Sequence, residues 1–350
     1  MDNQEFIQFK ENMLAAATSH NYLVAATIEL TNICNFKCHH CYLGDREHNT
    51  LDVVLVKRFL DELKEQGCIM LLLTGGEPLL HPHFKEIYIY AKQKGFIITV
   101  FTNGSMLSKE YIELFLLYKP YLIEVSLYGI DVDSYVAFTG VKDSYYKVKS
   151  SLNLMAENHI SFRLKTMLMK QTLPYIQGME QLAKIYDVQF RWDSYIVPTL
   201  NGDINVLENH LLDEETICTA ILSNNDLRTI VKNKLESTVL NDEQAIQRLY
   251  FCDAGRTNVF ISSDAKMSLC VIAREPFYDL IKGTIKNGRQ VLYEYSEQPM
   301  PVDYKCKGCK RIQFCRYCPS KFKLESGSIA PVERYCRIAE RLYNALQVEI

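Results

Sequence analysis

Three cysteines near the start of the chain, Cys34, Cys38 and Cys41, have the residue type and the spacing for metal chemistry. They lie in the run Cys-Asn-Phe-Lys-Cys-His-His-Cys. Three thiolates this close can hold three irons of a [4Fe–4S] cluster and leave the fourth iron without a protein ligand. A substrate or cofactor can bind that open iron. Structural zinc is the alternative, with His39 or His40 as fourth ligand, but no matching downstream pair completes a finger.

A second motif, Thr-Gly-Gly-Glu-Pro, follows the apolar run 68–73, which indicates a buried parallel strand. Gly75 and Gly76 let the backbone approach a ligand closely, and Glu77 can accept hydrogen bonds from a cationic amine. Together with the three cysteines, this motif resembles the radical S-adenosylmethionine (SAM) enzymes. In that family a CxxxCxxC motif binds the catalytic cluster. The resemblance implies that the loop ending at Pro78 binds the amino group of SAM.

Composition fits an enzyme with one or two packed domains. The 350 residues are 48% hydrophobic with a formal net charge of −3, which argues against disorder and against nucleic-acid partners. The acidic, polar start argues against a secretory signal, and no apolar run is long enough to span a bilayer. Twelve cysteines in such a protein indicate metal binding in a reducing compartment. We therefore expect a cytoplasmic protein without membrane partners.

Strand-like and helix-like patterns alternate over the first two-thirds of the chain and predict an α/β fold with a parallel sheet. Expected strands are 23–30, 69–74, 97–102, 122–127, 162–169 and 189–196, and expected helices are 55–66, 84–94, 109–117, 145–158 and 175–186. The resemblance implies a partial (β/α)6 TIM barrel. We expect an N-terminal extension (1–24), the radical SAM barrel (25–200), a connecting helical region (201–249) and a cysteine-rich domain (250–350).

The resemblance also implies further contacts with SAM. His40 precedes the third motif cysteine, where the family often stacks an aromatic ring on adenine, and the backbone of Tyr42 would contact the adenine amine. Ser126 would reach the ribose or carboxylate, and Lys165, more than Arg163, would pair with the carboxylate. Asn103 follows the third strand. Plainer interpretations are packing for Tyr42, a turn for Asn103 and a solvated surface for the basic pair.

Seven further cysteines lie in the last hundred residues, and four of them have the spacing Cys-x2-Cys-x5-Cys-x2-Cys. A zinc ribbon is one interpretation. The set also resembles the SPASM extension of radical SAM enzymes, and so implies two auxiliary clusters and three [4Fe–4S] clusters in all. By this resemblance the distal cluster is held by Cys306, Cys309, Cys315 and Cys336, and the proximal one by Cys252, Cys270 and Cys318. Cys218 would either close the proximal cluster or be a buried apolar residue.

The Cys-Arg-x-Cys-Pro form of this motif resembles the peptide-modifying branch of the family. The expected function is to install a thioether or carbon–carbon crosslink in a ribosomally made precursor peptide, with flavodoxin or ferredoxin as electron donor. The stretch before the first strand is too short for a leader-binding domain, so we expect leader recognition by the barrel surface or by a separate protein. Alternatives are a sulfatase-type formylglycine maturase with Asp193 as catalytic base, a haem-pathway enzyme, and a non-enzymatic iron–sulfur electron carrier.

Overall fold

The computed structural model describes residues 22–45, 47–236, 248–250 and 252–347, together with Asn12, Ala16, Ala17 and His20. Six parallel strands form the first part of its sheet, in the order β6-β5-β4-β3-β2-β1. They are β1 (Ala25–Thr31), β2 (Met70–Gly75), β3 (Ile97–Thr102), β4 (Leu122–Ser126), β5 (Phe162–Met167) and β6 (Phe190–Asp193). The predicted α/β class and the six parallel strands are confirmed.

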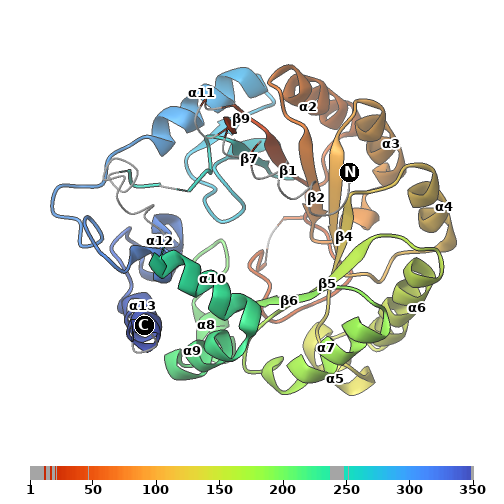
Figure 1. Cartoon of the computed structure of the whole chain (residues 1–350). Coiled ribbons are helices and arrows are strands. Elements are labelled where there is room, and N and C mark those ends of the chain that lie inside the picture. Colours follow the sequence, from red (N-terminus) through yellow and green to blue (C-terminus); the bar gives the residue numbers. More distant parts are fainter. Residues whose placement is uncertain are drawn as a thin grey trace.

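The helices that follow these strands lie outside them, as Figure 1 shows. Alternate strand residues such as Ile28 and Leu73 are completely buried in the same core as the apolar faces of two helices, which carry Phe59 and Ile87. The helices are α2 (Val53–Glu65), α3 (Phe84–Gln93), α4 (Lys109–Leu117), α5 (Val132–Thr139), α6 (Ser144–Glu157) and α7 (Ile176–Ile185). Short 3-10 turns are η1 (Pro78–Leu80) and η2 (Leu173–Tyr175). Sequence periodicity predicted these helices to within two residues, except the eight-residue α5.

The sheet continues across the boundary expected at residue 250. Strand β7 (Asn258–Ile261) pairs in parallel with β1, and β8 (Lys266–Ser268) and β9 (Phe277–Asp279) add antiparallel strands beyond it. The remaining elements of this part are α11 (Ile285–Ser296), η5 (Ile312–Phe314), α12 (Pro319–Ser326) and α13 (Glu333–Gln347). The cysteine-rich segment therefore begins as an extension of the barrel sheet.

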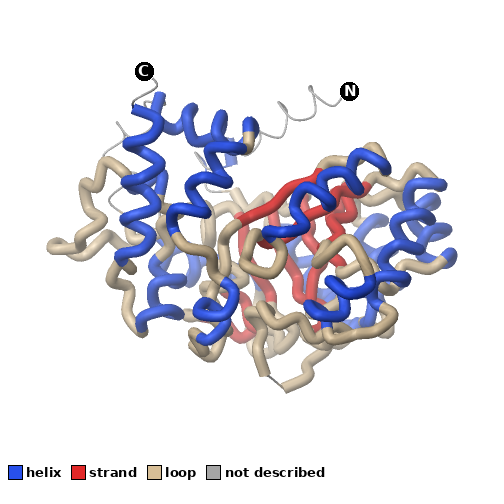
Figure 2. Tube along the Cα trace, turned by 90° about the horizontal axis from the view of Figure 1, so that it is seen from below, coloured by secondary structure: helices blue, strands red, loops and turns tan. Residues whose placement is uncertain are grey.

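The connecting region contains α8 (Asn205–His210), α9 (Glu214–Ser223) and α10 (Asn225–Glu236). Ile217 and Ile221 of α9 pack against Leu342 of α13 in a small apolar cluster separate from the main core. Figure 2 shows the strands in the middle of the molecule with helices on both sides. Among the residues that the structure describes, no helix is both long and apolar enough to cross a membrane.

Candidate cofactor site and cysteine groups

The loop after β1 brings Cys34, Cys38 and Cys41 together. The Cys41 amide donates to the Cys38 carbonyl at 3.1 Å, and the Phe36 amide donates to the Cys34 sulfur at 3.4 Å. Burial, with the charges of Glu77 and Cys41, raises the pKa of the Cys34 thiol to about 11. Burial and the two neighbouring cysteines also raise the pKa of Cys38. Thiols that oppose each other's ionisation become thiolates readily only beside a metal cation, so this donor set fits a metal cluster.

Two kinds of metal site could use these three cysteines, a zinc ion or an iron–sulfur cluster. In the part of the chain that the structure describes, no three Cys, His, Asp or Glu side chains lie close enough to hold a single metal ion. A zinc ion needs its ligands within about 2.3 Å. A cubane carries its irons at separate corners and so holds its cysteines further apart. The kind of metal that this cysteine group would hold stays a prediction.

The Gly-Gly-Glu-Pro loop is bound directly to the cysteine loop. The amide of Gly76 donates to the carbonyl of Thr31 at 2.8 Å, and the amide of Glu77 donates to the carbonyl of Ile33 at 2.9 Å. A Cβ atom on Gly75 would lie 2.3 Å from the Thr31 oxygen, and one on Gly76 would lie 2.5 Å from the Ile33 oxygen. Both glycines are thus needed for contact between the two motifs. The sequence alone predicted only that these glycines let the backbone approach a ligand.

Glu77 is completely buried, and its carboxylate accepts three hydrogen bonds from the protein. The donors are the Leu79 amide at 3.1 Å, the Thr102 hydroxyl at 2.8 Å and the Asn103 amide at 2.7 Å. Burial raises the pKa of this carboxyl to about 7 although the three bonds lower it. Glu77 therefore ties the loop to the end of β3 and caps η1, which begins at Pro78. Its predicted contact with the amine of SAM stays a prediction.

An aromatic group stands beside the cysteines. The ring of His40 lies 5.0 Å from Phe138 and 5.7 Å from Tyr128, measured between ring centroids. Burial, with nearby His210 and His39, lowers the pKa of His40 to about 4, so the imidazole is neutral. Its Nδ1 atom is buried and has no hydrogen-bond partner among the described residues. An unsatisfied buried acceptor or donor on an aromatic wall fits the predicted adenine site.

Other residues predicted to contact SAM already have protein partners. The Asn103 side chain donates to Asn35 at 2.9 Å and accepts from the Ser105 amide at 2.9 Å. The Tyr42 carbonyl accepts from the Leu200 amide at 2.8 Å. Ser126, at the end of β4, bonds to the Tyr128 hydroxyl. These contacts position the loops at the carboxyl ends of the strands, and direct contact with SAM stays a prediction for all three.

Inside the barrel, Glu124 forms ion pairs with three cationic side chains. The sequence alone did not predict these ion pairs. The Glu124 carboxylate is 1% exposed and pairs with Arg163, with Lys165 at 3.2 Å and with Arg191 at 2.7 Å. Burial would raise the pKa of Glu124, yet the three cations lower it to about 2. Lys165, predicted to bind the SAM carboxylate, is thus engaged by Glu124 and also lies over the Phe101 ring. Glu124 lies opposite Arg163 in the register of β4 and β5, which sequence alone does not give.

Asp193, the predicted base, ends β6 and forms an ion pair with Arg316. Arg316 follows Cys315 and has a φ of 49°, in the left-handed region that a side chain with a Cβ rarely adopts. The ion pair thus joins the barrel to the cysteine-rich segment at a strained backbone position. The role of Asp193 as a base stays a prediction.

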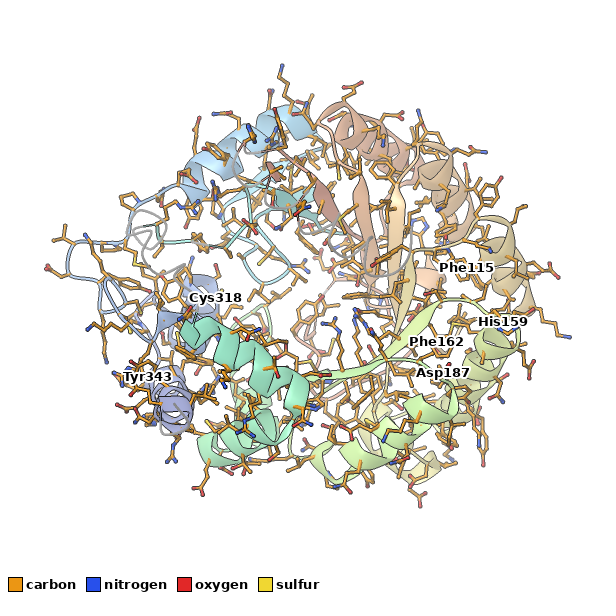
Figure 3. The ribbon with its side chains drawn as sticks, viewed as in Figure 1. Phe115, His159, Phe162, Asp187, Cys318 and Tyr343 are labelled. Carbon is orange, nitrogen blue, oxygen red and sulfur yellow. The ribbon has the colours of Figure 1, made fainter. Side chains whose placement is uncertain are left out.

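The division of the C-terminal cysteines into two cluster-binding sets stays a prediction, and electrostatic interactions link cysteines within each predicted set. Burial, with the nearby Cys318, raises the pKa of both Cys252 and Cys270, and the Tyr195 hydroxyl is hydrogen-bonded to Cys318. A second mutually interacting set is formed by Cys306, Cys309, Cys315 and Cys336. Figure 3 marks Cys318 at the start of α12, across the ring of elements from Phe162 of β5. The metal content of both sets stays a prediction.

Cys218 belongs to neither set. It lies on α9 in the apolar cluster with Ile217 and Leu342, and its sulfur is 3.8 Å from the Ile338 carbonyl. Of the two interpretations of this residue, the structure thus favours the buried apolar one. Among the residues that the structure describes, the cysteines that raise the pKa of Cys252 and Cys270 all belong to this predicted proximal set.

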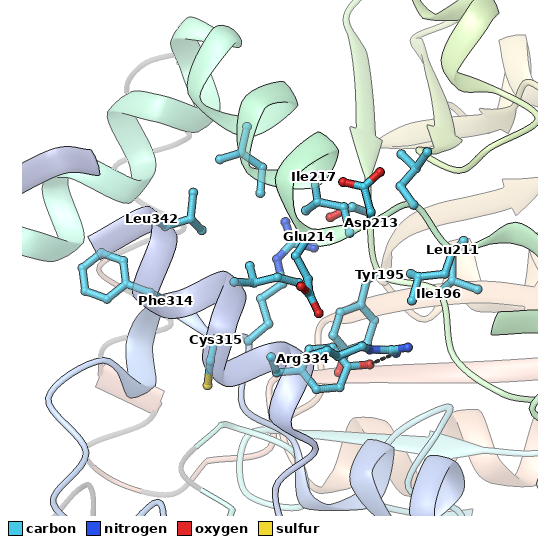
Figure 4. A pocket seen from close by; sticks show the side chains of 16 residues that line it. Tyr195, Ile196, Leu211, Asp213, Glu214, Ile217, Phe314, Cys315, Arg334 and Leu342 are labelled. Atoms are coloured by element: carbon cyan, nitrogen blue, oxygen red, sulfur yellow. Dashed lines mark hydrogen bonds between the residues drawn. The ribbon is translucent and has the colours of Figure 1, made fainter. Parts of the chain in front are cut away.

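A cavity of about 200 Å³ lies between the end of β6, α9 and α13. Figure 4 shows Tyr195, Ile217, Cys315 and Leu342 on its walls. This volume is smaller than that of most ligand pockets, and the lining contains none of the residues predicted to bind SAM. The cavity therefore marks the junction between barrel and cysteine-rich segment rather than the cofactor site.

Comparison with known proteins identifies the barrel. Residues 28–183, which include the front cysteines and the Gly-Gly-Glu-Pro loop, match the model of the radical SAM superfamily. The chain carries a radical SAM domain. Members of this superfamily use SAM and a [4Fe–4S] cluster.

Two curated relatives each match about half of this chain. The antilisterial bacteriocin subtilosin biosynthesis protein AlbA of Bacillus subtilis is 32% identical over 173 residues, which is 49% of this chain and 38% of AlbA. The AdoMet-dependent heme synthase of Methanosarcina barkeri is 28% identical over 178 residues, or 50% of this chain and 51% of the synthase. The matched part thus spans about half or less of either relative.

The similarity in fold extends much further along this chain. The crystal structure of Streptococcus suis SuiB bound to the precursor peptide SuiA superposes with a TM-score of 0.65 at 18% identity. It covers 93% of this chain and 79% of SuiB. At this identity the likeness shows the fold alone, and it includes the cysteine-rich segment beyond the barrel.

Proposed function

We propose that this radical SAM enzyme is a peptide maturase that installs a thioether or carbon–carbon crosslink in a ribosomally made precursor peptide. The observation that carries the proposal is that cysteines within each of the three predicted cluster-binding sets lie close enough to influence one another electrostatically, as one catalytic and two auxiliary clusters would require. A simple electron carrier has no use for the Gly-Gly-Glu-Pro loop bound against the first group.

The front of the barrel is suited to hold SAM and to exclude water. When bound, SAM and the reduced cluster would supply a 5′-deoxyadenosyl radical that abstracts a substrate hydrogen. Cys34, Cys38 and Cys41 would be the protein ligands, and the neutral His40 ring offers a face and a buried nitrogen to adenine. Glu77 keeps the loop that would face the methionine amine in one conformation.

The predicted ligands of the proximal cluster favour the thioether among the possible products. Cys252 precedes β7 and Cys270 follows β8, so both lie at the amino end of β7, while Cys34 follows the carboxyl end of the neighbouring β1. Three cysteines leave one iron of a proximal cubane without a cysteine ligand. A substrate thiolate could bind there and be held as an anion by the metal. Bond formation between this sulfur and a carbon radical releases one electron, which the auxiliary clusters would carry to an acceptor.

The relatives support a peptide substrate and keep one alternative open. AlbA takes part in the biosynthesis of a bacteriocin, and SuiB binds a precursor peptide. The heme synthase favours a haem-pathway enzyme as the second candidate. Flavodoxin or ferredoxin as donor, a separate leader-binding protein and a cytoplasmic location remain proposals, as does the formylglycine chemistry that would need Asp193 as a base.

Mass spectrometry of candidate peptides tests the proposal. The anaerobically reconstituted enzyme is incubated with SAM, dithionite and short cysteine-containing peptides encoded beside its gene. A thioether removes two hydrogens and makes one cysteine resistant to iodoacetamide, whereas a carbon–carbon crosslink removes two hydrogens and leaves every thiol reactive. Formation of an aldehyde would favour the alternative of a formylglycine maturase. Turnover of a porphyrin with no peptide product would contradict the proposal.

A further inference from the structure

A lysine is completely buried in the cysteine-rich segment. Lys321 is the third residue of α12, and its side chain has 0% exposure. Its ammonium donates to the carbonyl of Arg316 at 3.2 Å. It also lies over two aromatic rings, 3.9 Å from the centroid of Tyr195 and 3.5 Å from that of Tyr335. Lysine is among the residues least often found fully buried unless it is paired, so this position needs an explanation.

Each of these contacts comes from a residue that adjoins a predicted cluster ligand. Arg316 follows Cys315, and Tyr335 precedes Cys336, so both are sequence neighbours of cysteines predicted to hold the distal cluster. Tyr195 is bonded to Cys318 of the proximal set, and Cys318 is also the residue that begins α12. Lys321 therefore lies between the two auxiliary cysteine sets, within electrostatic reach of Cys318 and Cys315.

The described surroundings offer this ammonium no carboxylate of its own. Glu325, whose charge reaches Lys321, is ion-paired with Arg334 at 2.8 Å and accepts from the Tyr335 hydroxyl at 2.9 Å. Aromatic faces and one carbonyl stabilise a cation only partly. Burial accordingly lowers the pKa of Lys321 to about 7, although Cys318 would raise it as a thiolate. The negative charge that would complete this site is that of cysteine-ligated clusters on either side.

We propose that Lys321 is a positioning residue whose buried charge stabilises the reduced states of both auxiliary clusters and sets their potentials above that of an uncharged site. The reason is electrostatic, because a cluster gains negative charge on reduction and a fixed cation in a medium of low dielectric favours that gain. This inference rests on the two auxiliary clusters of the proposed function. It adds a residue that SPASM-type cysteine spacing does not point to.

Redox titration of the reconstituted enzyme, followed by electron paramagnetic resonance, tests the proposal. Lys321→Met keeps the length of the side chain and removes the charge, and should lower the midpoint potentials of both auxiliary clusters without moving that of the front cluster. Lys323→Met is the matched control, because Lys323 lies on the same helix but pairs with Glu275 at the surface. It should move none of the potentials.

The outcomes separate this inference from the proposed function. Wild-type enzyme without auxiliary clusters would overturn both, whereas auxiliary potentials unchanged in Lys321→Met would overturn this inference alone. Equal shifts in all three clusters would also overturn it, because the effect would not be local. If Lys321→Met does not load the auxiliary sites, Lys321→Arg decides. Loading restored by arginine supports a role for the charge, and loading lost in both variants contradicts it.

Discussion

The buried carboxylate of Glu77 leads to a prediction on how the stability of the protein depends on pH. Its pKa in the folded protein is raised to about 7 from an ordinary value of 4.5. Folding therefore takes up a proton between these two values, and the stability present below pH 4.5 is progressively lost as the pH rises through 7. The shift corresponds to about 3 kcal/mol once the carboxylate is ionised in the folded state.

Glu77→Gln removes the titration and keeps the shape of the side chain. The amide can accept at one oxygen only, so at least one buried donor among Leu79, Thr102 and Asn103 loses its partner, at a cost of about 1–3 kcal/mol. We expect the variant to be less stable than wild type near pH 5. The difference should shift by about 3 kcal/mol in favour of the variant near pH 8.

Urea unfolding of both proteins across this pH range measures the difference. Glu113→Gln, an exposed position on α4, is the control and should keep the wild-type dependence on pH. An identical dependence on pH in wild type and Glu77→Gln would refute the reasoning. SAM binding separates two roles of Glu77. A lost contact with the methionine amine would raise the dissociation constant ~10–150-fold, whereas a residue that only braces the loop should change it by less than about tenfold.

Three further predictions concern the barrel and the cysteine sets. Glu124→Gln leaves three cations without a carboxylate and should cost about 3–5 kcal/mol at neutral pH. Because these cations lower its pKa to about 2, the wild-type advantage should fade as the pH drops from 4.5 to 2, and Lys165→Met should recover part of the loss; an equally stable Glu124→Gln protein would contradict the ion group. Gly76→Ala places a Cβ against the cysteine loop and should reduce SAM cleavage, measured as 5′-deoxyadenosine; wild-type cleavage would show that the loops are not in contact. Cys270→Ala should lose about four irons while keeping SAM cleavage, and Cys218→Ala should lose none; equal losses would refute the assignment of these two residues.

Sequence periodicity predicted the helices and strands because each element buries one face. The parallel strands followed from the alternation of elements, and α5 was missed because its eight residues depend on a capping box between Asp131 and Ser134 rather than on a long apolar stripe. Asp193 was found as a strand-end acid, but its pairing with Arg316 requires the fold.

The partition of the C-terminal cysteines came from family resemblance and not from spacing. Cys315 and Cys318 are separated by two residues, yet the resemblance assigns them to different sets, and in the structure Cys315 acts on Cys306 whereas Cys318 acts on Cys270. Glu124 and Lys321 were missed for a related reason. The partners of a buried charge come from neighbouring strands or from distant segments, such as Tyr195 beside α12, and only the assembled structure brings them together.

Iron content together with SAM cleavage tests the central claim most directly. The anaerobically reconstituted wild type should hold about twelve irons per chain if each cysteine set binds a cubane. Replacing Cys34, Cys38 and Cys41 together with Ala should remove about four of them and abolish 5′-deoxyadenosine formation. About four irons in the wild type, or full cleavage of SAM by the triple variant, would contradict the assignment of the three cysteine groups.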